Sequence, residues 1–142
     1  MNQVTGIEKL PPQNLEAEES FLGSLLIDKD AIIRVADIVS EKDFYKEAHR
    51  TIFETIKDLY GRQEPIDILS LSNRLTEKDL LDKVGGRTYL AHLSNVTATS
   101  SHAKHYAQII QRKATLRRLL TAAAEISELG YKEIEDVEDL ID

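Results

Sequence analysis

The longest uninterrupted helical pattern in the sequence runs from His102 to Leu129, without proline or glycine, and is followed by Gly130. At about 100° per residue, the apolar residues of its first half fall on one face, and those of its second half fall on roughly the opposite face. The first set is Ala103, Tyr106, Ala107, Ile110 and Ala114, and the second set is Leu116, Leu119, Leu120, Ala123 and Ile126. A single straight core cannot cover both sets. We therefore expect the first half to pack on the preceding residues, and the second half to require another helix or another chain.

Six shorter segments with apolar residues at helical spacing precede this long helix. They predict helices over residues 14–27, 28–39, 47–60, 67–75, 76–84 and 87–95. Asn14, Asp28 and Asp67 are expected N-caps, because their side chains can accept hydrogen bonds from free backbone N–H groups. Thr76 to Asp79 has the spacing of a capping box, with Asp in place of Glu, and would open the fifth of these helices. No period-two alternation lasts beyond four residues, so we predict an all-α fold.

The same patterns divide the chain into four parts. These are an extended N-terminal arm (1–13), a globular head that is a compact bundle of about six helices (14–100), a long helix (101–130) and the start of a further helix (131–142). The arm is inferred from Pro11 and Pro12, which favour extended backbone. The last part is acidic and would be too short to form a stable helix alone. We therefore expect the sequence to be a fragment of a longer protein.

Charge and composition narrow the class of function. The 142 residues carry a net charge of -7, which argues against a domain whose main task is to bind phosphates and favours a protein partner. The chain contains no cysteine, which excludes disulfides and thiolate metal sites. No signal peptide and no stretch of about 20 apolar residues is present, so we expect a soluble, cytoplasmic protein without a membrane partner.

Candidate catalytic and metal-binding residues each have a simpler structural explanation. His102 and His105 could share a metal ion, but no third ligand accompanies them at suitable spacing. His49 and His92 lie beside apolar stripes, where hydrogen-bonded core or boundary histidines are common. The carboxylates of Glu16, Glu18 and Glu19 fall near a helix start, which the helix dipole explains. Gly85, Gly86 and Arg87 do not belong to a phosphate-binding loop motif. We therefore predict no catalytic residue, no bound cofactor and no metal in this chain.

One basic cluster supports an alternative function. Arg112, Lys113, Arg117 and Arg118 are the candidate contacts of a nucleic-acid-binding helical module. Glu125 and Glu128 follow within two turns, so a solvated face, or one that forms salt bridges between chains, is the preferred interpretation.

Several short motifs together resemble a known family. The opening stretch is Leu10-Pro11-Pro12-Gln13-Asn14-Leu15-Glu16-Ala17-Glu18, continued by Leu22-Gly23. It is followed in order by Asp43-Phe44-Tyr45, His49 with Ile52-Phe53, Pro65-Ile66-Asp67, Val84-Gly85-Gly86 with Tyr89-Leu90, and Tyr106-Ala107 with Ile109. Their order and spacing resemble the N-terminal domain of bacterial replicative DNA helicases of the DnaB type. The resemblance covers nearly the full chain, whereas the ATPase domain of that family has no counterpart in it.

The resemblance implies a function in assembly and partner binding. In this family a globular head is followed by a helical hairpin, and the long helix would be the first arm of that hairpin, with residues 131–142 beginning the second. Hairpins pair between subunits, so that the N-terminal collar of the hexameric ring is a trimer of dimers. We expect Leu116, Leu119, Leu120, Ala123 and Ile126 to serve oligomerisation. The expected contacts with the C-terminal domain of primase are Glu16, Tyr89, Leu120 and Ile126.

The resemblance also assigns the chemistry to another part of the longer protein. ATP and Mg would bind in the RecA-like domain of the longer protein, which unwinds duplex DNA at the replication fork. That longer protein would therefore make the contacts with DNA. This chain would not itself be an enzyme. A helicase loader is a further candidate partner. The helicase-binding domain of primase has a related fold and stands as a second alternative, although the motif that starts at Leu10 favours the helicase.

Overall fold

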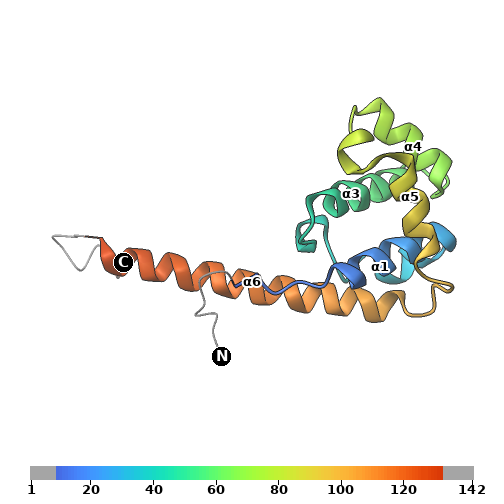
Figure 1. The fold of residues 1–142 in the computed structure, drawn as a ribbon. Helices are drawn as coiled ribbons and strands as arrows, with labels where there is room; N and C mark the ends of the chain where they lie inside the picture. The colour runs from blue at the N-terminus through green and yellow to red at the C-terminus, as the bar shows by residue number, and fades with distance from the viewer. Residues whose placement is uncertain (1–8, 133–142) are drawn as a thin grey trace.

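The computed structural model describes residues 9–132, and it is all-α over that range (Figure 1). Its α-helices are α1 (Leu15–Ile27), α2 (Ala31–Val35), α3 (Glu47–Gly61), α4 (Ile68–Glu77), α5 (Gly86–Asn95) and α6 (Ala103–Tyr131). Two 3₁₀ turns, η1 (Glu41–Asp43) and η2 (Asp82–Val84), complete the secondary structure of these residues. The first five helices form a head at one end, and α6 passes under α1 and extends well beyond it. The predicted fold class and the terminal long helix are confirmed.

Three phenylalanines form the centre of the head. Phe21 of α1, Phe44 after η1 and Phe53 of α3 are fully buried, with ring centroids 5.3 to 5.9 Å apart. The tilted and edge-on arrangement of these rings adds to the stabilisation from burying them. The head therefore has a continuous apolar core, which α1 shares with the first half of α6.

A glycine allows α1 and α5 to approach each other closely. A Cβ placed on Gly23 would overlap the backbone carbonyl of Leu93, so no other residue fits at this crossing. Gly23 therefore sets how closely the two helices can pack.

The predicted helix caps are mostly confirmed. Asn14 Oδ1 accepts the N–H of Ala17 at 2.9 Å, and Asp67 Oδ1 accepts the N–H of Ser70 at 2.7 Å. Asp28 does not cap α2, because its carboxylate instead accepts hydrogen bonds from the Asp30 N–H at 2.9 Å and the Ser100 hydroxyl at 2.6 Å. Helix α2 itself is a short element that ends at Val35, four residues before the predicted end.

The prediction of a fifth helix over residues 76–84 is wrong. Helix α4 continues through Thr76 to Glu77, and the chain then turns at Asp79, whose φ of 59° is left-handed. The N–H of Leu80 bonds back to the carbonyl of Leu75 at 2.8 Å and closes the turn. A capping box needs extended backbone at its first residue, and Thr76 is helical, so only the 3₁₀ turn η2 forms here.

The two halves of α6 differ in burial as the sequence predicted. Ala103, Ala107, Ile110 and Ala114 are buried against the head. Beyond residue 115 nearly the whole helix is exposed, and Arg117 is the half-buried exception. None of the helices over residues 9–132 is long and apolar enough to cross a membrane. The predicted second arm lies outside the described residues, except for Tyr131 and Lys132 at its start.

Candidate functional site

The second half of α6 carries an unpaired apolar surface, which we call the distal apolar face. It consists of Leu116, Leu119, Leu120, Ala123 and Ile126. Leu119, Leu120 and Ile126 are 65%, 55% and 69% exposed. Large apolar side chains gathered on one exposed face indicate a surface that another helix or chain covers. The structure therefore leaves open the half of the long helix that was expected to need a partner.

Arg117 fixes the point at which α6 leaves the head. Its guanidinium donates to the carbonyl of Pro12 at 2.7 Å and to the carbonyl of Asp43 at 2.6 Å, and it lies over the ring of Tyr45 at 5.5 Å. Burial lowers the pKa of the guanidinium below its usual value. Arg118 adds an ion pair to Asp43 Oδ1 at 2.9 Å. We call this set of contacts the Arg117 junction, and it ties the N-terminal arm, the η1 turn and α6 together.

The Arg117 junction corrects the preferred interpretation of the basic cluster. Arg117 was expected on a solvated face or in a salt bridge between chains, yet it is half-buried and bonds within this chain. Arg118 is exposed, as expected, but its ion pair is also made within this chain. Helical periodicity could not reveal this, because their partners are two backbone carbonyls and one carboxylate far away in sequence. Arg112 is exposed and Lys113 is half-buried on the same helix, so these two remain as the candidate nucleic-acid contacts without such bonds.

A buried polar chain joins α1, α3 and α5, and sequence reasoning missed it. Glu18 Oε1 lies 2.7 Å from His49 Nδ1, His49 Nε2 lies 2.6 Å from the Tyr89 hydroxyl, and that hydroxyl lies 2.8 Å from Glu19 Oε2. Glu18 also accepts the Tyr45 N–H at 2.7 Å. We call this set the His49 network. The helix dipole alone does not explain why carboxylates stand at positions 18 and 19, because Glu18 and Glu19 both have specific hydrogen-bond partners. The prediction that His49 is a hydrogen-bonded core histidine is confirmed.

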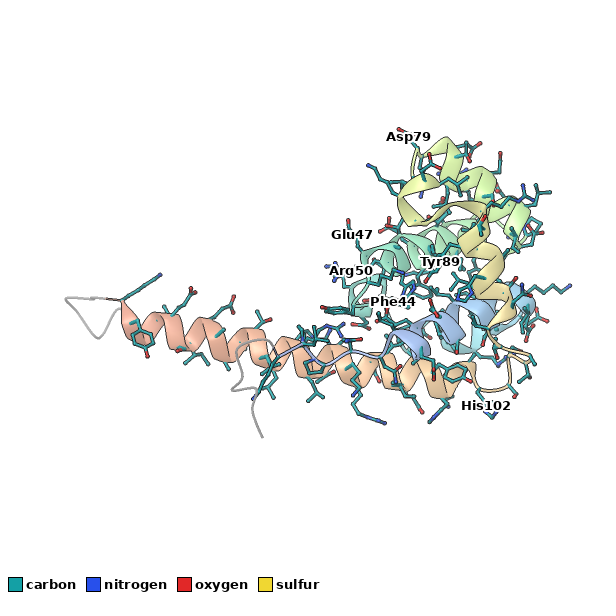
Figure 2. The ribbon with its side chains drawn as sticks, in the orientation of Figure 1. Phe44, Glu47, Arg50, Asp79, Tyr89 and His102 are labelled. Atoms are coloured by element: carbon teal, nitrogen blue, oxygen red, sulfur yellow. The ribbon has the colours of Figure 1, made fainter. Side chains whose placement is uncertain are left out.

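Tyr89 is a half-buried member of the His49 network and lies in the head above α6 (Figure 2). Burial, and then the Glu19 carboxylate, raise the pKa of its hydroxyl. The Lys46 ammonium lies 4.6 Å from the ring centroid, and the exposed His92 ring stacks beside it at 5.8 Å. The hydroxyl and the ring of Tyr89 therefore both have partners within the chain, and these contacts set its orientation before any other protein binds.

The four residues expected to contact primase lie on two parts of the molecule. Glu16 is exposed on α1, and Tyr89 lies on α5, both in the head. Leu120 and Ile126 lie on the distal half of α6, and Leu120 shares an open cleft of about 640 Å³ with Leu10, Pro11 and Pro12. A partner that touched all four residues would have to span the Arg117 junction.

The described residues also show how the histidine pair is placed. His102 precedes the first turn of α6, and the rings of His102 and His105 both lie against Tyr106, with centroids 6.3 and 6.1 Å away. Over residues 9–132 no group of three or more His, Asp or Glu side chains could hold a metal ion. The geometry of this range is that of a small all-α domain with a projecting helix.

Comparison with known proteins identifies the family of this domain. The family model described as the DnaB-like helicase N terminal domain matches residues 10–112. The chain is 36% identical over 134 residues to the replicative DNA helicase DnaC of Bacillus subtilis, and 41% identical over 134 residues to the replicative DNA helicase DnaB of Mycobacterium leprae. The chain therefore belongs to the DnaB-like helicase N-terminal domain family.

Solved structures agree with this assignment. The N-terminal domain of DnaB helicase from Mycobacterium tuberculosis matches with a TM-score of 0.88 at 40% identity, over 93% of each chain. A DnaB-like replicative helicase, solved to show its interactions with primase, shares the fold with a TM-score of 0.71 at 24% identity, over 90% of this chain and 34% of that one. The matches with the B. subtilis and M. leprae helicases cover 94% and 93% of this chain but only 30% and 22% of those proteins.

Proposed function

We propose that this chain is the assembly and partner-binding domain of a longer replicative DNA helicase. In this proposal the distal apolar face pairs with the equivalent helix and its hairpin partner in another subunit, and three such pairs form the N-terminal collar of a hexamer. One observation carries the proposal: α6 buries its apolar residues on the head as far as Ala114, and then exposes five apolar residues on another side.

The energetics of burial support pairing through this face. Each fully buried Leu or Ile side chain contributes roughly 1.5–3 kcal/mol relative to leaving it in water. Leu119, Leu120 and Ile126 are more than half exposed in the single chain, so most of this contribution is still available for association. Chain pairing would use it without disturbing the core of the head.

The proposal assigns primase binding to the head and the distal half of α6 together. Glu16 and Tyr89 would provide the contacts on the head, and Leu120 and Ile126 those on the helix. The solved complex of a DnaB-like helicase with primase shows that a protein of this fold has this partner. The fixed orientation of Tyr89 in the His49 network supports such a role, because a contact residue that is already ordered loses little conformational entropy on binding.

Catalysis is assigned to the part of the longer helicase that this chain does not span. ATP and Mg would bind there, DNA would be unwound there, and a loader would act on the whole assembly. The alternative function as a nucleic-acid-binding module receives less support, because the guanidinium groups of Arg117 and Arg118 already bond to Pro12 and Asp43.

Sedimentation equilibrium of the Leu119→Ser variant tests the pairing. The chain as printed and the chain extended by about forty following residues, enough for a second hairpin arm, would be compared. We expect the extended chain to dimerise more strongly than the printed chain, and Leu119→Ser to weaken that dimer. Leu69→Ser is the matched control, because Leu69 on α4 is equally exposed at 65%. An extended chain that stays monomeric would contradict the proposal.

Titration with the C-terminal helicase-binding domain of a primase tests the second role. We expect Glu16→Lys and Ile126→Ser each to weaken binding, since they change opposite ends of the assigned surface, while Glu54→Lys leaves it unchanged. Glu54 is an exposed residue of α3. Binding that is indifferent to both assigned residues would remove the primase surface and leave the pairing proposal standing. Oligonucleotide titration at low salt, with and without Arg112→Gln, tests the alternative.

A further inference from the structure

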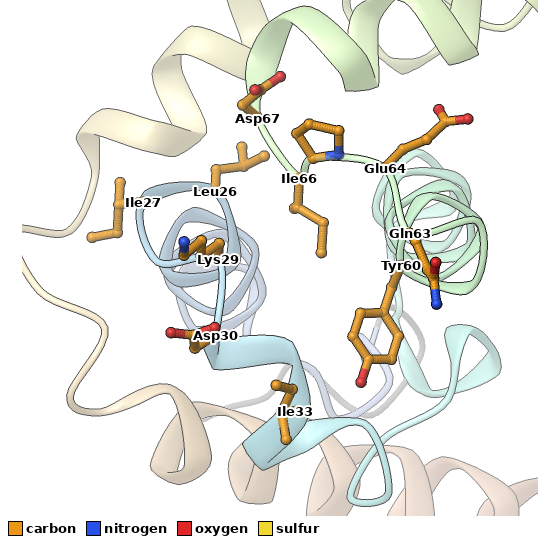
Figure 3. A pocket seen from close by; sticks show the side chains of 11 residues that line it. Leu26, Ile27, Lys29, Asp30, Ile33, Tyr60, Gln63, Glu64, Ile66 and Asp67 are labelled. Atoms are coloured by element: carbon orange, nitrogen blue, oxygen red, sulfur yellow. The ribbon is translucent and has the colours of Figure 1, made fainter.

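An open cleft of about 710 Å³ lies on the head between two backbone segments (Figure 3). One wall is the end of α1 with the turn into α2, and the other is the end of α3 with the loop into α4. The side chains of Ile33, Tyr60 and Ile66 point toward the space between the walls. None of the lining residues belongs to α6, and none is among the residues assigned above to pairing or primase binding. The cleft is therefore a separate feature of the head, and we call it the acidic cleft because Asp30, Glu64 and Asp67 line it.

Both walls of the acidic cleft are held by hydrogen bonds. In the first wall, the N–H groups of Asp30 and Ala31 donate to Asp28, at 2.9 and 3.0 Å. In the second wall, the Glu64 N–H donates to the carbonyl of Leu59 at 2.9 Å, and Asp67 caps α4. A cleft with fixed walls binds a ligand without first having to order its own backbone.

The apolar side chains of the cleft are unusually exposed for their size. Ile33 is 62% exposed, and Tyr60 and Ile27 are close to half exposed, while Ile66 is buried at the floor. Tyr60, near the end of α3, lines this cleft. The surface offers apolar anchoring sites that the head's own core does not use.

Negatively charged side chains predominate around these apolar groups. Asp30, Glu64 and Asp67 line the cleft, and Lys29 is the one cationic lining residue. Nearby carboxylates are matched: Asp28 pairs with Arg34 at 3.3 Å, and Asp58 pairs with Arg74 at 2.7 Å. Within residues 9–132, by contrast, neither Asp30 nor Glu64 forms an ion pair within 4.0 Å. A ligand with positively charged groups could therefore form ion pairs with Asp30 and Glu64.

We propose that the acidic cleft binds a short segment of another protein in which apolar side chains are flanked by Lys or Arg. The apolar residues would fill the space around Ile33, Tyr60 and Ile66, and the cations would pair with Asp30 and Glu64. Phosphate-bearing partners fit poorly because the carboxylates repel them. A second copy of this chain fits less well, since its net charge is -7.

A synthetic amphipathic peptide of leucine and lysine tests the proposal, with a leucine and glutamate peptide of the same pattern as its control. Fluorescence anisotropy would measure binding to the 142-residue chain. We expect Ile33→Ser and Glu64→Lys each to weaken binding of the lysine peptide about tenfold, a loss of 1.4 kcal/mol. Leu69→Ser and Glu54→Lys are the matched controls, and they should leave the dissociation constant unchanged. Circular dichroism would establish that all four variants fold.

Amide chemical shifts of the labelled chain locate the peptide. Shift changes concentrated in residues 26–33 and 60–67, with only weak binding of the glutamate peptide, would support the proposal. Changes spread over the acidic surface, or equal losses for test and control variants, would overturn it as non-specific attraction. Concentration-dependent shifts in the cleft without peptide would overturn it in favour of a second copy. Failure of pairing through α6 would affect none of these measurements.

Discussion

His49 Nε2 lies 2.6 Å from the hydroxyl of Tyr89, at the centre of a polar chain that starts on the buried carboxylate of Glu18 and ends on Glu19. Tyr89 has a single hydroxyl proton, and two potential acceptors face it, Glu19 Oε2 and His49 Nε2. The hydroxyl can donate to only one of these two atoms, so the hydrogen bonds along the chain depend on one another. The His49 network therefore connects the half-buried Tyr89 to the fully buried His49 and Glu18 inside the head.

Replacement of His49 by Ala should destabilise the head strongly. The change leaves the buried Glu18 carboxylate without its imidazole partner, and a buried polar group that loses its hydrogen-bond partner costs about 1–3 kcal/mol, more when the group is charged. Urea unfolding followed by far-UV circular dichroism would measure the free energy of unfolding. His105→Ala is the control, because His105 is exposed on α6 and lies outside the network, and we expect it to change stability by less than about 0.5 kcal/mol. Equal effects of the two changes would contradict the role of the network.

Replacement of Arg117 by Met should loosen the Arg117 junction. The carbonyls of Pro12 and Asp43 would lose their donors, at a cost of about 1–3 kcal/mol if they stay dry. Hydrogen exchange should then rise in the η1 turn and in the middle of α6. The matched change Arg112→Met removes an exposed charge on the same helix and should leave exchange unaltered. Unchanged exchange in Arg117→Met would show that the two hydrogen bonds do not hold α6.

Replacement of Gly23 by Ala should be costly although alanine favours helices. The new Cβ would overlap the Leu93 carbonyl, so α1 and α5 would have to move apart, and overpacking of this kind typically costs about 1–3 kcal/mol. The control Gly61→Ala adds a methyl group where no atom lies within 4 Å. Gly61 is the last residue of α3, so that change should be neutral or slightly stabilising. Thermal unfolding of both variants measures the contrast.

Stability on the acid side should depend on Asp58. Its hydrogen bond from Arg74, and then that from Arg62, lower its pKa from the usual 3.8 to about 2. A carboxyl group with a pKa lowered by folding stabilises the protein fully above its unfolded pKa, and this contribution is lost as the pH falls from about 4 to about 2. Unfolding measured between pH 5 and pH 2 should show this loss in the wild-type chain and a smaller one in Asp58→Asn. If the free energy of unfolding fell equally with pH in the wild-type chain and in Asp58→Asn, the stabilising role of Asp58 would be contradicted.

Local periodicity predicted most of the fold, and the reasons for its failures are specific. Helix positions and the change of face in α6 follow from side-chain spacing, which the sequence displays directly. The turn at Asp79 depends on a left-handed residue that propensity disfavours, and the missing side-chain cap of α2 follows from Asp28 bonding to Asp30 and Ser100 instead. Both outcomes are decided by contacts that the neighbouring residues do not reveal.

The candidate site was predictable only in its apolar part. Leu119 and Ile126 could be assigned to an uncovered face because a helical wheel shows that the core cannot reach them. The partners of Arg117 could not be predicted, because they are the backbone carbonyls of Pro12 and Asp43, and every residue type has such a carbonyl. Glu18 looked like an ordinary residue of a first helical turn, since nothing nearby in sequence indicates that His49 and Tyr45 meet it. The acidic cleft likewise joins two segments about thirty residues apart.

The position of Arg117 along α6 means that a small change of angle at this residue moves the far end of the helix by a larger distance. About fourteen residues of α6 follow it, which at 1.5 Å per residue is roughly 20 Å of helix beyond the junction. Rotation by about 5° there would carry the far end of the helix nearly 2 Å sideways by simple geometry, an amplitude typical of helix shifts at subunit interfaces. The contacts of one guanidinium with the arm and the η1 turn therefore set the position of the distal apolar face, several helical turns away.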